Sequence, residues 1–593
     1  MKVLLVVPEI RLNDKPFEFP FWAGILASIV ENKGGDVAIL DLNALRMNYG
    51  GGFVPTEVIK EELSAEKWDL IGVGGLTTTY NRLKQLIPLI RQVNPDSMLI
   101  AGGGWCSYNP DEILDLIPEI NMICIGEGEE TFSEVYDEIK NKTFDFEKVK
   151  GLCINNSGDK KYTEPRALIS NLDSVPVPHY DLFETDIYFK YSSYPYSRES
   201  FNSKRRASAV WERGCPRGCT FCSHNGMSRI DLQNIYGKGD RKKGELVVKE
   251  VDKKNDTFQQ VARWPTPEYA VNNVKLLKEK FDIDFITIED ENMTSNLKWT
   301  KEFCNLYIKE GLNETVKWGT LGDAPSVAVK PEILQVMKDA GCTYISFGFE
   351  SASNKVLNED IQKGQTRKHL ETTINEIRKV GLRPLATFMI GNPNEDINDL
   401  METLEFWLEF NIEVDPFICT PYVGSPIFYN HKDRVLEQYD ERLKLTKNNP
   451  NISQKTIKKW KLAALDRFMT ECGDATAYTA TVSKNFSISE LYSIKRFMYT
   501  KDTERLLRMA HERFEQIGQK QWMHDKKWKK YCAIRKANDE LFPQIKVNLY
   551  QERSLTTLTN EKRRIADINN TTPIKTVPAA INVRLVFNLP TSE

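Results

Sequence analysis

The chain has 593 residues, of which 41% are hydrophobic, so it is too long for one core and is expected to form two or three domains. Its formal net charge of -3 gives no overall positive field, which argues against nucleic acid as a partner. No apolar run approaches the roughly 20 residues of a membrane span, and the first residues lack the pattern of a signal peptide. Eleven cysteines without paired spacing indicate reduced thiols and a cytoplasmic protein.

The first 150 residues alternate apolar runs with amphipathic segments, which is typical of a parallel sheet covered by helices. The predicted strands are 2–7, 36–42, 69–75, 97–104 and a fifth that starts at 122. This order predicts a doubly wound α/β domain over residues 1–150, with glycines at the carboxyl ends of its strands where a ligand can approach the backbone. A linker over residues 151–206 is expected to follow.

A second series of strands begins at residue 207 and predicts a partial or full (β/α) barrel over residues 207–430. Its six strands are expected within 207–214, 284–294, 316–323, 343–353, 384–396 and 414–426. Residues 229–262 form a polar insertion in this series. Beyond it, a mostly helical domain is predicted over 431–550 and an aperiodic tail over 551–593.

Three cysteines lie close together in "CPRGCTFC", at positions 215, 219 and 222. Because they follow the first barrel strand, they are expected on the face where barrel active sites form. A zinc site would need a fourth ligand, for which His224 is the nearby candidate. A 4Fe-4S cluster with Cys215, Cys219 and Cys222 would keep one iron open to a ligand from outside the protein.

The cysteine spacing, with Phe221 directly before the last cysteine, resembles the signature of the radical S-adenosylmethionine (SAM) enzymes. The resemblance implies that the three cysteines hold a 4Fe-4S cluster, whose open iron binds SAM and whose electron cleaves it to a 5'-deoxyadenosyl radical. An electron donor such as flavodoxin or ferredoxin is implied as well. Phe221, Glu350 in "FGFES", and Ile390 with Gly391 in "FMIGNPNED" are the positions that the resemblance assigns to SAM binding.

The amino-terminal domain, with "GLTTTYNR", "IAGGGWCSYNPDEI" and "CIGEGEETF", resembles the cobalamin-binding domain of cobalamin-dependent radical SAM enzymes. The residues that this resemblance places at cobalamin are Thr77, Thr78, Thr79, Gly102, Gly103, Gly104, Gly126 and Glu127. The first histidine of the chain is His179, so the Asp-x-His-x-x-Gly motif of the mutases is absent and no histidine from residues 1–178 can reach cobalt. The alternative is a degenerate domain that has lost the cofactor.

Four further residues are candidates for contact with substrate, although no catalytic residue is assigned. Glu289, Asp290 and Glu291 follow the second barrel strand, where carboxylates can bind hydroxyl groups or accept a proton. The alternative for this acidic run is a charged loop without a role in binding. Cys419 lies on the sixth predicted strand and is a candidate to face the cavity.

The two resemblances together imply a cobalamin-dependent radical SAM methyltransferase. Its substrate would be a small molecule or a lipid, methylated at an unactivated carbon or at phosphorus. Oxidation, cyclisation or rearrangement by the same cofactors is the first alternative, and a cobalamin sensor without catalysis is the second. A methylthiotransferase would need a second set of cysteines, and the contexts of Cys106, Cys124 and Cys153 do not match that pattern.

Overall fold

The structure is a computed structural model that describes residues 1–12, 14–191, 203–223, 262–410, 412, 416–447, 449, 451–472 and 479–498. Nearly all of the predicted insertion 229–262 lies outside the described residues, as do His224, the end of the predicted helical domain and the tail 551–593. The described residues all belong to one compact unit, Met1–Met509.

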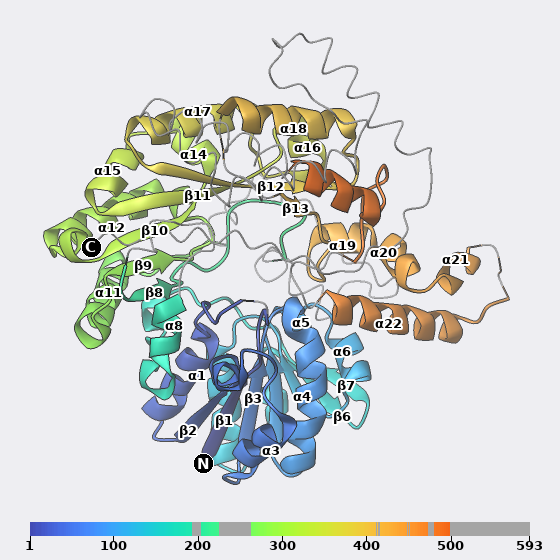
Figure 1. The fold of residues 1–593 in the computed structure, drawn as a ribbon. Helices are drawn as coiled ribbons and strands as arrows, with labels where there is room; N and C mark the ends of the chain where they lie inside the picture. Colours follow the sequence, from blue (N-terminus) through green and yellow to red (C-terminus); the bar gives the residue numbers. More distant parts are fainter. Residues whose placement is uncertain are drawn as a thin grey trace. The chain divides into compact units, whose positions relative to one another are not determined.

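The first domain is built on a seven-stranded sheet with the order β2-β1-β3-β4-β5-β6-β7 (Figure 1). The five parallel strands match the five predicted from the apolar runs. They are β1 (Lys2–Val7), β2 (Asp36–Asp41), β3 (Leu70–Gly74), β4 (Met98–Gly102) and β5 (Met122–Cys124). The doubly wound arrangement is therefore confirmed, and the loops after β3, β4 and β5 share one edge of the sheet.

An antiparallel hairpin of β6 (Leu152–Asn156) and β7 (Asp159–Tyr162) extends this sheet beyond residue 150. Ser157 and Gly158 connect the two strands with positive φ values of 55° and 97°. Such a pair of left-handed residues suits a two-residue turn, because its twist matches that of the strands. Part of the segment predicted as a linker thus belongs to the sheet.

Helices cover both faces of the sheet because their apolar side chains recur every three or four residues. In α7, for example, the buried residues include Phe132, Val135, Tyr136 and Ile139. The helices of this part of the chain are α1 (Phe21–Asn32), α2 (Leu42–Leu45), α3 (Thr56–Ser64), α4 (Tyr80–Val93), α5 (Gly104–Ser107), α6 (Pro110–Leu116), α7 (Glu129–Lys140) and α8 (Thr185–Tyr191).

The second domain contains a six-stranded, wholly parallel sheet with the order β13-β12-β11-β10-β9-β8. Its strands are β8 (Arg206–Ala209), β9 (Phe285–Ile288), β10 (Lys317–Gly322), β11 (Cys342–Glu350), β12 (Arg383–Ile390) and β13 (Phe417–Ile418). All six overlap the predicted segments, and β8, β11 and β12 each begin one residue earlier than predicted. Because β8 and β13 stand at opposite edges of the sheet, the predicted barrel is a partial one (Figure 1).

Helices follow the strands of this sheet in the alternation expected of a (β/α) barrel. They are α11 (Pro267–Phe281), α12 (Leu297–Lys309), α13 (Leu312–Thr315), α14 (Ala324–Val329), α15 (Ile333–Asp339), α16 (Asn354–Val356), α17 (Arg367–Lys379) and α18 (Ile397–Phe410). Parallel strands bring the loops at their carboxyl ends to one edge, so the loops after β8 to β12 lie at one mouth of the partial barrel.

A helical region follows β13 and joins the two domains. It consists of α19 (Pro426–Asn430), α20 (Lys432–Tyr439), α21 (Arg442–Leu445) and α22 (Gln454–Glu471). One apolar core includes Ile71 of the first domain together with Phe428 and Phe468 of the helical region. No helix within the described residues is long and apolar enough to cross a membrane.

Candidate functional site

The three clustered cysteines lie in the loop that follows β8, here called the cysteine loop (residues 213–223). Cys219 is 6% exposed, whereas Cys215 and Cys222 are half-buried. All ten cysteines in the described part of the chain, these three included, are thiols rather than disulfides. Three thiols on one strand-end loop fit the donor set of an iron–sulfur cluster, since thiolates are the usual ligands of iron in such clusters.

A reciprocal pair of carboxyl groups holds the start of the cysteine loop against the loop after β9. Asp290 Oδ1 accepts hydrogen bonds from the backbone N–H groups of Trp211 (2.6 Å) and Glu212 (2.9 Å). In return, Glu212 Oε2 accepts one from the backbone N–H of Asn292 (2.8 Å). Asn292 Nδ2 then lies 4.0 Å from Cys215 Sγ. The ends of β8 and β9 are therefore tied together directly beside the first cysteine.

Both of these carboxyl groups are buried close to each other, which makes their charged forms unfavourable. Burial raises the pKa of Asp290 to about 6. Burial raises the pKa of Glu212 well above its usual range, and the charge of Asp290 adds to this effect. Asp290 Oδ2 and Glu212 Oε1 have no hydrogen-bond partner within the described residues. Asp290, a candidate substrate contact by sequence, is thus engaged with backbone groups.

The other candidate substrate residues lie in different surroundings. Burial raises the pKa of Glu289 to about 8, and the charge of Glu18 in the first domain adds to the effect. Burial raises the pKa of the Cys215 thiol to about 11, and the negative charge of Glu291 contributes to this rise. Cys419 is fully buried, and burial raises its pKa.

The middle of the cysteine loop is held by Asp323, which is fully buried at the end of β10. Arg217 donates from Nε to Asp323 Oδ1 at 2.8 Å and from Nη2 to Asp323 Oδ2. Asn292 Nδ2 also donates to Asp323 Oδ1, at 3.2 Å. Phe221, which the sequence assigns to SAM binding, packs at the edge of the main apolar core. The loop is therefore fixed by both charge and packing.

Glu350 ends β11 with a positive φ of 61°, a conformation that is uncommon for a residue other than glycine. The register between β11 and β12 shifts between Gly348 and Glu350, so the strand bulges at this point. Lys363 Nζ lies 3.1 Å from Glu350 Oε1 and donates to the carbonyl oxygen of Gly348 at 2.5 Å. Glu350 is thus held at the barrel mouth by a lysine whose side chain is 13% exposed.

Ile390 and Gly391 mark the turn at the end of β12, and a buried glutamate holds this turn. Gly391 has a positive φ of 84°, and its backbone N–H donates to Glu395 Oε2 at 2.6 Å. The backbone N–H of Asn392 donates to the same oxygen at 3.1 Å. Burial raises the pKa of Glu395 to about 8. Ile390 itself is fully buried.

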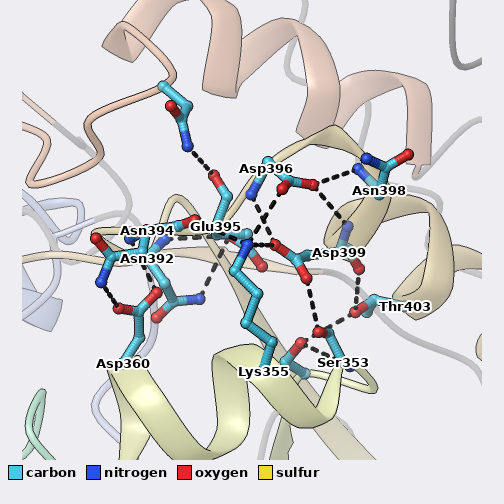
Figure 2. Close-up of polar contacts among 12 residues, drawn as sticks. Ser353, Lys355, Asp360, Asn392, Asn394, Glu395, Asp396, Asn398, Asp399 and Thr403 are labelled. Atoms are coloured by element: carbon cyan, nitrogen blue, oxygen red, sulfur yellow. Dashed lines mark hydrogen bonds and ion pairs between the residues drawn. The ribbon is translucent and has the colours of Figure 1, made fainter.

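Figure 2 shows the polar contacts around this turn. Lys355 lies between Asp396 (3.1 Å) and Asp399 (2.8 Å), which anchors the start of α18. Asn394 Nδ2 donates to Asp360 Oδ1 at 2.6 Å, which joins the turn to the segment after β11. Side-chain contacts therefore hold the turn on two sides, from α18 and from the segment after β11.

The residues predicted to bind cobalamin lie at the carboxyl ends of β3, β4 and β5. Thr79 Oγ1 donates to the carbonyl oxygen of Leu76 at 2.7 Å, so this hydroxyl stabilises its own turn. Thr77, like Thr79, is buried, and Thr78 is half-buried. The threonines therefore differ in how much of their side chain a ligand can reach.

The glycines differ in the same way. A Cβ on Gly103 would lie 2.3 Å from the carbonyl oxygen of Gly75, and one on Gly104 would lie 2.9 Å from the ring of Tyr108. These two positions need glycine for internal packing. A Cβ on Gly102 would meet no atom closer than 3.8 Å. The space beside Gly102 and the left-handed backbone of Gly126, with a φ of 88°, fit a strand-end edge that a nucleotide tail can approach.

Glu127 contacts the second domain. Its carboxylate forms two hydrogen bonds with Arg263, at 2.7 and 3.1 Å, and accepts a third from the backbone N–H of Ile169 at 2.7 Å. Arg213 and Arg263, the partners of the acidic "GEGEE" run, are not predicted from the sequence, and neither is Tyr108. The acidic run has no basic residue nearby in the sequence, which indicates that its partners come from elsewhere in the chain. This signal does not identify the partners, because they lie more than 80 residues away.

Comparison with known proteins agrees with this division of the chain. Residues 11–136 match the model of the B12 binding domain, and residues 211–406 match the model of the radical SAM superfamily. An uncharacterized methyltransferase of Pyrococcus horikoshii is 27% identical over 433 residues, which cover 72% of this chain and 82% of that protein. The anaerobic magnesium-protoporphyrin IX monomethyl ester cyclase of Rubrivivax gelatinosus is 23% identical over 73% of this chain and 71% of its own length.

The fold is similar to that of OxsB, a cobalamin-dependent SAM radical enzyme whose structure contains aqua-cobalamin and SAM. The TM-score is 0.57 at 15% identity, and the match covers 96% of this chain and 79% of OxsB. The two family matches follow each other in the order of the two sheets, and the cysteine loop lies inside the second match. The chain belongs to the radical SAM enzymes that carry a B12-binding domain before the radical SAM domain.

Proposed function

We propose that the protein is a cobalamin-dependent methyltransferase that transfers the methyl group of SAM to an unactivated carbon, or to phosphorus, of a small molecule or lipid. The observation that carries the proposal is the direct contact between the cysteine loop and the strand-end loops of the B12-binding domain. Tyr108, after β4, donates to the carbonyl oxygen of Ser223 at 2.5 Å. Such contact supports chemistry that uses the ligands of both domains together.

The described residues suit three bound groups. Cys215, Cys219 and Cys222 would hold a 4Fe-4S cluster. Glu350 and the turn at Ile390 and Gly391 would hold SAM, with Phe221 near its adenine. Cobalamin would lie along the strand ends at Thr77, Thr78, Thr79, Gly102, Gly103, Gly104 and Gly126. Because Glu127 is paired with Arg263, its part would be to support the loop rather than to contact the cofactor.

When bound, these groups supply an electron that cleaves SAM to a carbon radical and a cobalt centre that can carry a methyl group. The protein's own part is orientation. Lys363 fixes the Glu350 carboxylate, and Glu395 fixes the backbone of the turn at Gly391. Asp323, through Arg217 and Asn292, holds the cysteine loop in place. Fixed ligands of this kind lower the cost of ordering at the moment of reaction.

Oxidative cyclisation remains the second candidate function, because the relative from Rubrivivax gelatinosus is named as a cyclase. Methyl transfer is preferred because the relative from Pyrococcus horikoshii is named as a methyltransferase and shares more sequence. We further propose a cytoplasmic location and reduction by an electron carrier such as flavodoxin or ferredoxin.

The experiment uses the full chain reconstituted with iron, sulfide and cobalamin. It is incubated with methyl-deuterated SAM, a reductant and fractionated small-molecule and lipid extracts from the source cells, and the products are analysed by mass spectrometry. The proposal predicts a compound that gains one CD3 group. A compound that changes mass through loss of hydrogen, with no deuterium gained, would replace methyl transfer by oxidation or cyclisation.

A further inference from the structure

Both ends of the cysteine loop are held by the B12-binding domain. The first residue of the loop, Arg213, pairs with Glu129 after β5, and the last residue, Ser223, accepts a hydrogen bond from Tyr108 after β4. The loops after β4 and β5 are also the loops that carry most of the residues expected at cobalamin. The cysteine loop is therefore in contact with the candidate cobalamin loops at two separate points.

The first point of contact is a cluster of four charged side chains. Glu127 is bound by both terminal nitrogens of Arg263, and Glu129 Oε1 lies 2.5 Å from Arg213 Nη2. Glu127, Glu129 and Arg263 have side chains only 10 to 11% exposed. Removing one partner of such a buried ion pair destabilises the protein, because the remaining charge then has no partner in a poorly hydrated site.

The two arginines of this cluster are themselves joined through the backbone. The N–H of Arg213 donates to the carbonyl oxygen of Arg263 at 2.9 Å, and the N–H of Arg263 donates back at 3.0 Å. The segment before α11 and the start of the cysteine loop are therefore joined by two backbone hydrogen bonds. A shift of the loop after β5 would therefore also displace Arg213, which lies two residues before Cys215.

The second point of contact is the ring of Tyr108, which is 7% exposed. The ring lies against two glycines, because a Cβ on Gly104 would come within 2.9 Å of it and one on Gly424 within 2.3 Å. Gly424 belongs to the loop after β13, and its φ is 99°. Larger residues at either glycine would push the ring away from Ser223. The packing of the ring thus fixes the direction in which the Tyr108 hydroxyl points, toward Ser223, the residue next to Cys222.

We propose that Tyr108 and the Glu127–Arg263 and Glu129–Arg213 pairs form a clamp that fixes the cysteine loop relative to the loops after β4 and β5. This inference rests on the proposed function, in which the cysteine loop holds the cluster and the loops after β4 and β5 hold cobalamin. The clamp residues are positioning residues. Their role is to set the separation of the two metal centres, and each domain can bind its own cofactor without them.

The test compares two double variants of the full chain. Glu127→Gln with Glu129→Gln removes both carboxylates of the clamp. Glu130→Gln with Glu134→Gln is the control, since these glutamates lie on α7 together with Glu129 but pair with Arg166 instead of the cysteine loop. Tyr108→Phe removes only the hydroxyl and keeps the ring against Gly104 and Gly424.

The first measurement is hydrogen exchange of the amides at residues 213–223 in the protein without cofactors. We expect about tenfold faster exchange in the clamp variant than in the control, and a smaller rise in Tyr108→Phe. Equal exchange in the clamp variant and the control would overturn the clamp. This measurement does not depend on methyl transfer, so it remains decisive if the proposed function is wrong.

The second measurement is the magnetic coupling between cobalt(II) and the reduced cluster in the reconstituted protein, followed by pulsed electron paramagnetic resonance. The clamp predicts a single narrow distance distribution in the parent protein and the control, and a broad one in the clamp variant. A merely structural role would lower stability without broadening the distribution. An unchanged narrow distribution in the clamp variant would therefore reject the proposal.

Discussion

Lys363 Nζ lies 3.1 Å from Glu350 Oε1, and both side chains are nearly buried at the mouth of the partial barrel. The two residues are only 13 positions apart, yet they connect the bulged end of β11 with the segment before α17. Since Glu350 has a left-handed backbone conformation, this ion pair stabilises a local strain near the proposed SAM site.

The first prediction concerns that pair. Lys363→Met leaves the Glu350 carboxylate buried without its charge partner, so we expect a loss of about 3 kcal/mol in the free energy of unfolding. SAM affinity should fall together with stability. Chemical denaturation and isothermal titration with SAM measure the two effects. The Lys363→Met, Glu350→Gln double variant is the control, and a loss equal to the sum of the single losses would show that the pair does not interact.

The second prediction concerns the pH dependence that Glu395 imposes. Burial raises its pKa in the folded protein to about 8, above the value in the unfolded chain, so the folded state retains a proton that the unfolded state releases. The stabilising effect of this proton is complete below the unfolded pKa and is lost as the pH rises towards 8. Glu395 Oε1 has no hydrogen-bond partner within the described residues, which is consistent with a protonated oxygen there.

Unfolding of the parent protein and of Glu395→Gln should therefore be compared between pH 5 and pH 8. The amide cannot ionise and still accepts from Gly391 and Asn392. We expect the parent to lose stability relative to this variant by up to about 1.4 kcal/mol per pH unit. Parallel stability curves for the two proteins would contradict the raised pKa.

The third prediction separates the hydrogen bonds of Asp290 from its charge. Asp290→Ala leaves the backbone N–H groups of Trp211 and Glu212 buried without an acceptor, which costs about 2 to 4 kcal/mol and should loosen the cysteine loop. Asp290→Asn keeps one acceptor oxygen and removes a charge beside Glu212. Iron content after anaerobic reconstitution should fall in the alanine variant and stay near the parent value in the asparagine variant. Equal iron content in both variants would refute this role.

The fourth prediction concerns the cysteines themselves. The variant with alanine at Cys215, Cys219 and Cys222 should lose nearly all of the roughly four irons per chain of a 4Fe-4S cluster. Cys304→Ala is the matched control, because Cys304 is a fully buried thiol on α12 and not part of the cysteine loop. Iron retained by the triple variant would exclude these cysteines as ligands.

The sequence predicts the strands of both sheets well, because buried parallel strands such as β1 and β3 appear as unbroken apolar runs. It predicts the cysteine loop because three thiols within eight residues are typical of a site that binds a metal ion or an iron–sulfur cluster. The hairpin of β6 and β7 was missed, since the polar strand "DKKY" lacks an apolar pattern. The turn residues Ser157 and Gly158 were its only local signal.

The contacts that assemble the site were harder to predict. Tyr108 and Ser223 are 115 positions apart, and Glu127 and Arg263 are 136 apart. Neither local propensity nor periodicity predicts contacts between residues so far apart in the sequence. Glu127 was expected at cobalamin because of the loop in which it lies, whereas its side chain is directed to the second domain. The direction of this side chain depends on the packing of the two domains, which the sequence does not specify.

Methyl transfer is tested most directly by the fate of SAM in the reconstituted protein with its substrate. With methyl-deuterated SAM and a reductant, we expect labelled product together with S-adenosylhomocysteine and 5'-deoxyadenosine in comparable amounts. This balance arises because one SAM provides the methyl group and a second provides the radical. Product that forms with 5'-deoxyadenosine, but without label and without S-adenosylhomocysteine, would contradict methyl transfer.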